Sequence, residues 1–279
     1  MRQRRFVQID VFSPQPTRGN GLAVVVDAQG LCDEQMQRFA SWTNLAETSY
    51  LLPPEDPAAD YRLRIFTPNQ ELPFAGHPTL GSCAAWLHCG GQPRRPGRVV
   101  QECGVGLVEI ECGSEQLAFA APPTSCAPLS EEDERRLIEA LSIDPAKVLR
   151  SASLDNGPTW QVLELDSAGA VLSVDATRVR WPDFTPIGLI GRHSSAVDCD
   201  CEVRMLAPST GMLEDPITGS LNAAIASWMA QEGRLDRELV IAQGSVIGRH
   251  GRVYVRTEAD GRILIGGDTR VLIDGQLSL

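Results

Sequence analysis

The segment HPTLGSCAAWL, from His77 to Leu87, has a counterpart later in the chain in DPITGSLNAAIASWM, from Asp215 to Met229. In each segment a titratable residue and a proline precede a Gly-Ser pair, and a run of small and apolar residues follows. A helix that is apolar all round is a buried helix. We therefore expect a buried central helix in each half of the chain, starting from Gly81 and from Gly219.

Two more segments repeat in the same order. RGNGLAVVVD is matched by DNGPTWQVLELD, a turn at Asn-Gly followed by a strand, and YRLRIFTP is matched by CEVRMLAP. The offsets are 136 residues from Asn20 to Asn156, 140 from Arg64 to Arg204 and 138 from Ser82 to Ser220. This pattern predicts an internal duplication into two domains of one topology, since a solenoid needs at least about three units.

The strand pattern points to the fold class. Segments such as FVQIDVF, GLAVVVDA and ETSYLL have strand character and come in hairpin-like groups around few helices. This favours an α+β fold in which each domain is a curved, mostly antiparallel sheet around its central helix. A helix is expected over Asp33–Trp42, with Asp33 as N-cap and Asn44 at its end. Ala121–Ser130 is the linker candidate, and Ser130 with Asp133 forms a capping box that opens the next helix.

Composition excludes several functions. The chain has 279 residues and a net charge of −11, which disfavours binding to nucleic acid and to anionic membranes. No apolar region follows the basic N-terminus and no run approaches the length of a membrane-spanning helix, so we expect a cytoplasmic protein. The eight cysteines are scattered without a C-x-x-C pair, and we expect reduced, mostly buried thiols. Cys199 and Cys201 alone are a weak metal motif.

The two Gly-Ser corners supply candidate site residues. Helix N-termini carry free N–H groups and partial positive charge, so two of them facing each other across a domain cleft would bind a carboxylate. His77 and Asp215 lie at these corners, and Glu47 starts a strand where its carboxyl group could exchange protons. The alternatives are a simple turn at His77, a structural N-cap at Asp215 and a solvated surface residue at Glu47.

Several motifs together resemble the PhzF-like isomerases of the phenazine-biosynthesis type. They are RGNGLAVVVDA, TNLAETSYLL, RIFTPNQELPFAGHPTLGSCAAWL, VRMLAPSTGMLEDPITGSLNAAIASWM and AQGSVIGRHGRVYV. The resemblance implies the diaminopimelate epimerase fold, with the active site between two similar domains. It also implies proton transfer on a small anionic substrate without a metal or organic cofactor, and a homodimer. The first domain would cover residues 1–120, completed by a C-terminal strand at 268–279, and the second would cover residues 121–267.

The resemblance also assigns roles to individual residues. It implies that Glu47 is the acid/base group and that His77 and Asp215 act with it. The residues that it places at the substrate are Gly76, Gly219, Ser220 and Asn20. Two positions depart from the family pattern: glycine follows Asn20 where many relatives have proline, and SLNAA follows Gly219 in place of a run of smaller residues.

Three other functions are alternatives to this one. A racemase with two opposed thiols is disfavoured because no cysteine lies at either helix mouth. A hydrolase with a Ser220–His77–Asp215 triad is disfavoured because the serine lacks a G-x-S-x-G elbow. A binding protein that keeps the site without turnover is the remaining alternative. The resemblance to the PhzF-like isomerases therefore implies a cofactor-independent isomerase that moves a proton, by general acid/base catalysis, on a small carboxylate-bearing substrate similar to a cyclic amino acid.

Overall fold

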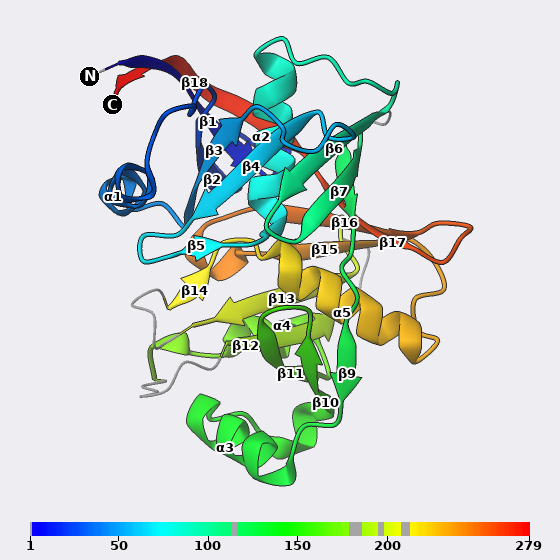
Figure 1. The fold of residues 1–279 in the computed structure, drawn as a ribbon. Coiled ribbons are helices and arrows are strands. Elements are labelled where there is room, and N and C mark those ends of the chain that lie inside the picture. The colour runs from blue at the N-terminus through cyan, green and yellow to red at the C-terminus, as the bar shows by residue number, and fades with distance from the viewer. Residues whose placement is uncertain (1, 113–115, 179–185, 195–197, 208–212) are drawn as a thin grey trace. The chain divides into compact units, whose positions relative to one another are not determined.

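The chain divides into two compact units in the computed structural model, which describes residues 2–112, 116–178, 186–194, 198–207 and 213–279. Unit 1 comprises Met1–Ala120 and Gly266–Leu279, and unit 2 comprises Ala121–Ile265. The C-terminal segment therefore belongs to the same unit as the N-terminus, and Figure 1 shows the two chain ends close together.

The elements follow one another in a similar order in the two units. Unit 1 contains β1 (Gln3–Val11), β2 (Asn20–Val25), α1 (Asp33–Thr43), β3 (Glu47–Leu52), β4 (Tyr61–Phe66), β5 (Glu71–Leu72), α2 (Gly76–His88), β6 (Arg98–Cys103), β7 (Gly106–Glu111), β8 (Leu117–Ala120) and β18 (Thr269–Ser278). Unit 2 contains β9 (Ser125–Ala127), α3 (Glu131–Leu141), β10 (Val148–Asp155), β11 (Thr159–Leu165), α4 (Ala168–Ser173), β12 (Ile187–Arg192), β13 (Cys201–Leu206), β14 (Glu214–Asp215), α5 (Gly219–Gln231), β15 (Leu239–Gln243) and β16 (Gly251–Thr257). β17 (Ile263–Gly267) spans the boundary, and short 3₁₀ turns lie at Pro145–Lys147, Ala176–Arg178 and Ser245–Ile247.

Strand pairing confirms the internal duplication. In unit 1, β1–β2 is antiparallel, β2–β3 parallel, β3–β4 antiparallel, β4–β6 parallel and β6–β7 antiparallel. The same series of orientations joins β10, β11, β12, β13, β15 and β16 in unit 2. One further strand completes each series, β18 antiparallel to β1 and β9 antiparallel to β10. The α+β fold class is likewise confirmed, because long ladders surround few helices.

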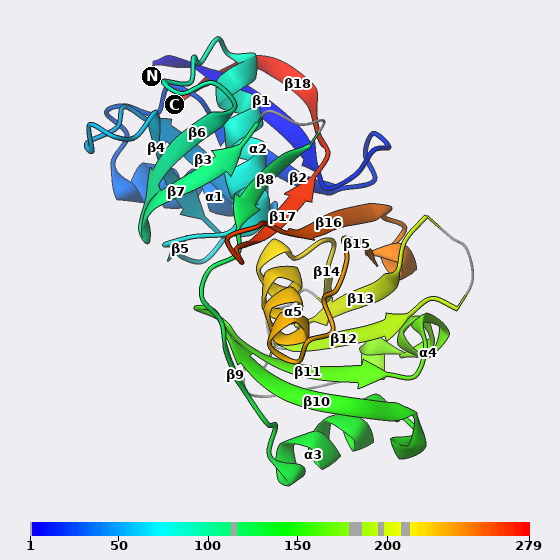
Figure 2. The same ribbon diagram turned by 90° about the vertical axis from the view of Figure 1, so that its right-hand side faces the viewer.

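A buried helix forms the centre of each unit. α2 contacts β1, β2, β3, β4, β6, β8 and β18, and Figure 1 shows it enclosed by these strands. In unit 2, Figure 2 shows α5 against the strands β10 to β13, and most of its residues are buried. Burial of nearly the whole helix surface explains why these two segments lack polar residues along one face.

The expected start of the first central helix is wrong. α2 begins at Gly76, so Gly81 lies inside it and His77 is its second residue. The sequence pattern is ambiguous at Pro78, because proline is tolerated in the first turn of a helix as well as in the loop before it. In the structure it lies in the first turn. A Cβ atom on Gly81 would lie 2.6 Å from Leu22 Cδ2 and 2.9 Å from Val11 Cγ2. Gly81 therefore allows the helix to pack closely on β1 and β2.

The structural correspondence between the halves also differs from the expected one. Gly76 and Gly219 each begin a central helix, which aligns PFAGH, ending at His77, with PITGS, ending at Ser220. The offset is thus 143 residues here, against 140 between Arg64 and Arg204. The β13–β14 connection is three residues longer than the β4–β5 connection, which accounts for the change. Residues 208–212 of that connection lie outside the described part of the chain.

Local signals succeeded at some positions and failed at others. Asn44 ends α1 in the left-handed conformation with φ 54°, as expected. The Ser130 side chain accepts the expected bond from the Asp133 N–H, but the Asp133 carboxylate accepts from the Ser130 hydroxyl group, so the capping box is correct only in part. The N-cap of α1 is Cys32, however, and Asp33 is the first residue of the helix, where its carboxylate pairs with Arg64 at 2.7 Å.

The cysteine prediction is correct in part. All eight thiols are free. The expectation of mostly buried thiols is wrong, since only Cys83 and Cys201 are buried and Cys32 is exposed.

Candidate active site

Three predicted site residues of unit 1 lie together. Glu47 begins β3 and Asn20 begins the neighbouring strand β2, while His77 lies in the first turn of α2. The His77 Nε2 atom is 3.3 Å from Glu47 Oε2, and its Nδ1 atom is 3.4 Å from Asn20 Nδ2. The side chains of His77 and Glu47 are 5% and 17% exposed. The surface-residue alternative for Glu47 and the simple turn at His77 are therefore wrong.

Burial sets the charge state of the histidine. It lowers the pKa of His77 from 6.5 to about 3, so the imidazole is neutral near pH 7. An Asn amide nitrogen only donates, and in the tautomer that accepts this bond at Nδ1 the single ring proton lies on Nε2, which faces Glu47. Within the described part of the chain, this Nε2 atom has no hydrogen bond of good geometry. A buried polar atom without such a bond is suited to a ligand atom.

The neutral histidine should make stability depend on pH. The pKa of a histidine in the unfolded chain is about 6.5, and that of His77 in the folded protein is about 3. Between these two pH values the unfolded chain binds one more proton than the folded protein, so the free energy of unfolding falls as the pH falls. Compared with His77→Gln, the wild type should lose about 2 kcal/mol more between about pH 7 and pH 5. Urea unfolding midpoints of both proteins at the two pH values measure this. Equal losses in the two proteins would contradict a buried neutral imidazole.

The central helices present uncapped N-termini. α2 starts at Gly76 and α5 starts at Gly219, and neither N-cap residue, Ala75 or Thr218, makes a side-chain bond that caps its helix. The first N–H groups of a helix have no partner within the helix and carry partial positive charge. Each N-terminus is thus chemically suited to a carboxylate group.

The predicted residues of unit 2 form a second group. Asp215 Oδ2 lies 2.5 Å from the Thr218 hydroxyl, and Gln243 Nε2 lies 3.2 Å from the Asp215 carbonyl oxygen. Ser220 is half-buried, and its carbonyl oxygen accepts a bond from Asn156 Nδ2 at 2.8 Å. Asp215 belongs to β14, and the α5 N-cap is Thr218, so the N-cap alternative for Asp215 is wrong.

Sequence reasoning missed three members of this group: Thr218, Gln243 and Asn156. Asn156 could have been found, because it was matched to Asn20 and both asparagines reach the second residue of a central helix. Gln243 gave no signal, since it lies 25 residues from Thr218 in the sequence and only the fold brings them together.

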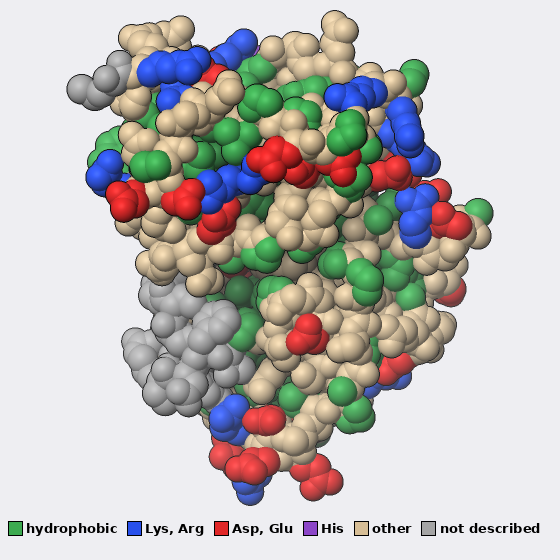
Figure 3. Space-filling model, viewed as in Figure 1, with side chains coloured by type: hydrophobic (Ala, Val, Ile, Leu, Met, Phe, Trp, Pro, Cys, Tyr) green, Lys and Arg blue, Asp and Glu red, His purple; other side chains and the backbone are tan. Residues whose placement is uncertain are grey.

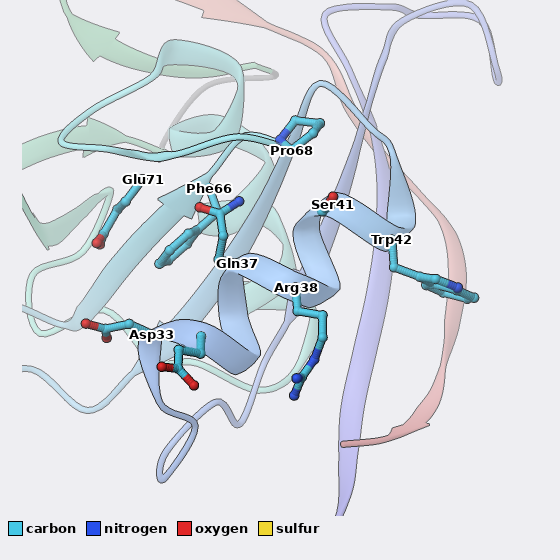
Figure 4. A pocket seen from close by; sticks show the side chains of 9 residues that line it. Asp33, Gln37, Arg38, Ser41, Trp42, Phe66, Pro68 and Glu71 are labelled. Atoms are coloured by element: carbon cyan, nitrogen blue, oxygen red, sulfur yellow. The ribbon is translucent and has the colours of Figure 1, made fainter.

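The hollowed surface beside α1 is unrelated to these groups. Figure 4 shows its lining, which includes Asp33, Arg38, Trp42 and Phe66 and none of the predicted site residues. On the face shown in Figure 3, acidic and arginine side chains are interspersed, in keeping with the absence of a large basic excess. No helix within the described ranges has the length and apolar character needed to cross a membrane.

Comparison with known proteins identifies the class of the fold. The structure is similar to that of a PhzF-family phenazine biosynthesis protein from Bacillus anthracis, with a TM-score of 0.85, 22% identity and 100% of both chains covered. This defines the two-domain diaminopimelate epimerase-like fold, as expected.

The sequence comparisons identify the family. Residues 9–277 match the family described as phenazine biosynthesis-like protein. The chain is 33% identical to antisense-enhancing sequence 1 of Schizosaccharomyces pombe and 31% identical to trans-2,3-dihydro-3-hydroxyanthranilate isomerase of Pseudomonas aeruginosa, with 99% of each chain covered in both cases. The protein belongs to the phenazine biosynthesis-like family, and it is an isomerase.

Proposed function

We propose that this isomerase moves a proton on a small carboxylate-bearing substrate and that Glu47 carries the proton. The observation that supports this most is the Glu47–His77 pair, a carboxyl group 3.3 Å from a neutral, buried imidazole nitrogen. The Nε2 proton can stabilise the Glu47 carboxylate while it acts as a base. When Glu47 becomes protonated, the Nε2–H group can donate to a substrate oxygen instead.

The other residues have supporting roles in this proposal. The N–H groups at Gly76 and those at Gly219 each provide donors suited to a carboxylate or to negative charge that develops on the substrate. Asp215 and Ser220 orient amino or hydroxyl groups of the substrate. Asn20 is only 2% exposed and faces His77, which supports a role in holding the imidazole rather than direct contact with substrate.

The chemistry of a relative suggests the substrate class. The Pseudomonas aeruginosa relative is named for trans-2,3-dihydro-3-hydroxyanthranilate. That compound is a cyclic amino acid, with a carboxylate for a helix N-terminus and an amine and a hydroxyl group for polar side chains. We propose that the present chain acts on a cyclic, amino-acid-like carboxylate of this kind, without a cofactor.

Turnover in deuterated water tests the proton transfer. Wild-type protein is incubated in D₂O with trans-2,3-dihydro-3-hydroxyanthranilate and with ring-substituted analogues. We expect one deuterium at the newly protonated carbon of the product, because the Glu47 carboxylic acid exchanges with solvent between the two steps. Mass spectrometry and proton NMR measure its amount and position. Retention of a compound by the protein with no isomerisation and no deuterium uptake would support the binding-protein alternative.

The hydrolase alternative has less support. Both ring nitrogens of His77 face groups other than the triad members, namely Asn20 and Glu47, and the Asp215 carboxylate is bonded to Thr218. The homodimer and the cytoplasmic location stay predictions.

A further inference from the structure

Thr218 occupies the N-cap position of α5 but does not act as a cap. Its side chain makes no hydrogen bond to the first turn of the helix. The hydroxyl group instead lies 2.5 Å from Asp215 Oδ2 and 2.9 Å from Gln243 Nε2. Thr218 is 8% exposed and Gln243 is fully buried, so water does not compete freely for these bonds.

Fixed backbone groups determine the orientation of the Gln243 amide. Its Oε1 atom lies 3.0 Å from the Thr218 N–H, which can only donate. Its Nε2 atom lies 3.2 Å from the Asp215 carbonyl oxygen, which can only accept. Oε1 also accepts a bond from Asn222 Nδ2 at 2.8 Å. The opposite orientation of the amide would place like groups together at two backbone contacts.

This orientation gives the network a direction. Gln243 Nε2 donates to the Thr218 hydroxyl oxygen, so the one proton of that hydroxyl is available for Asp215 Oδ2. Asp215 is therefore the acceptor in this bond. The bond fixes the direction in which the second carboxylate oxygen points.

A comparison of α5 with the equivalent helix α2 distinguishes this arrangement from ordinary helix capping. The N-cap of the equivalent helix α2 is Ala75, which has no hydroxyl group, so a central helix of this fold starts without one. Leu72 takes the place of Asp215 in the register of the two short strands. A buried glutamine is nevertheless present in both halves, since Gln101 Nε2 bonds to Thr79 in the first turn of α2. The pair formed by the Thr218 hydroxyl and the Asp215 carboxylate therefore belongs to unit 2, and Ala75 and Leu72 occupy the equivalent positions in unit 1.

We propose that Thr218 is a positioning residue whose hydroxyl group, oriented by Gln243, holds the Asp215 carboxylate for the substrate. The role at the substrate rests on the proposed function of Asp215, whereas the hydrogen bond itself does not. Two experiments therefore address the bond and its role separately.

The first experiment needs no substrate. The protein is labelled with ¹³Cγ-aspartate, and the Asp215 signal is assigned as the one missing from the spectrum of Asp215→Asn. We expect this signal to shift in Thr218→Val, which keeps the side-chain shape but removes the hydroxyl group. It should return close to its wild-type position in Thr218→Ser. An Asp215 signal that is unchanged in Thr218→Val would overturn the proposal, whatever the enzyme acts on.

The second experiment measures kinetics with trans-2,3-dihydro-3-hydroxyanthranilate, or with the analogue found to exchange deuterium. Thr218→Val should raise KM about 10-fold or more and lower kcat less, because a misdirected orienting group weakens substrate binding. Thr218→Ser should restore KM. Ser130→Ala removes an ordinary cap from α3 in the same unit, so it should lower the melting temperature by a few degrees and leave KM unchanged.

The outcomes are distinguishable. A shifted Asp215 signal with wild-type KM in Thr218→Val would overturn the positioning role while leaving the hydrogen bond intact. A raised KM in Ser130→Ala of the same size would show that general destabilisation explains the effect, and it would also overturn the role. If the wild type converts none of the compounds, the substrate proposal fails, and the ¹³C measurement alone decides whether Thr218 holds Asp215.

Discussion

Glu47→Gln should reduce kcat by at least about 10²-fold, the lower end for removal of a positioned general base. The amide has the same shape as the carboxyl group and can still lie beside His77 Nε2, so we expect the fold to be kept. Ligand binding should also be nearly unchanged, because the helix N-termini at Gly76 and Gly219 are untouched. The measurements are kcat on the exchanging substrate and the Kd of 3-hydroxyanthranilate, an aromatic analogue with no ring proton to move in this way.

A second glutamate of the same unit provides the control. Glu55 is exposed and pairs with Arg62 at the surface, so Glu55→Gln should have wild-type kcat. Deuterium uptake from D₂O should disappear in Glu47→Gln and persist in Glu55→Gln. Near-normal kcat in Glu47→Gln would remove Glu47 from the proton transfer and leave the Glu47–His77 pair as a structural contact.

Arg204→Met should destabilise the protein by about 3–5 kcal/mol, the usual effect of leaving one member of a buried ion pair alone. The Arg204 guanidinium lies 2.7 Å from Glu214, and both side chains are only 2% exposed. It also donates to the carbonyl oxygens of Val171 and Val174 at the end of α4. The substitution would leave the Glu214 carboxylate buried and unpaired beside Asp215.

The duplication supplies a matched control for this prediction. Arg64 is equivalent to Arg204 and pairs with Glu71, the equivalent of Glu214, and also with Asp33. The Arg64 side chain is 17% exposed, but those of Glu71 and Asp33 are 41% and 80% exposed, so both carboxylates stay solvated without it. Arg64→Met should therefore cost only about 0–1 kcal/mol. Calorimetric melting of the full chain compares the two variants, and Arg204→Met/Glu214→Leu should recover most of the loss. Equal small effects of the two single substitutions would show that the buried pair does not hold β13 to β14.

Local sequence signals were sufficient where the residue type itself favours the local backbone geometry or bonds directly to the backbone. Asn44 tolerates the left-handed conformation that ends α1, and Ser130 caps α3 through its own hydroxyl group. They failed at the start of α2, where the N-cap is Ala75, whose side chain makes no cap bond to the first turn. The α2 segment reads as a corner because Pro78 is compatible with both a corner and a first helical turn.

The sequence by itself determined the duplication, the fold class and the identities of Glu47, His77 and Asp215 as candidates, because repeats and motifs are properties of residue order. Only the tertiary structure decided that His77 corresponds to Ser220 and that Gln243 directs the Thr218 hydroxyl towards Asp215. It also decided that the Arg204–Glu214 pair is buried while the equivalent Arg64–Glu71 pair lies at the surface. These features depend on contacts between segments distant in sequence and on the environment each contact acquires. Residue type alone specifies neither, since the same Arg–Glu pair is a surface contact in one unit and a core contact in the other.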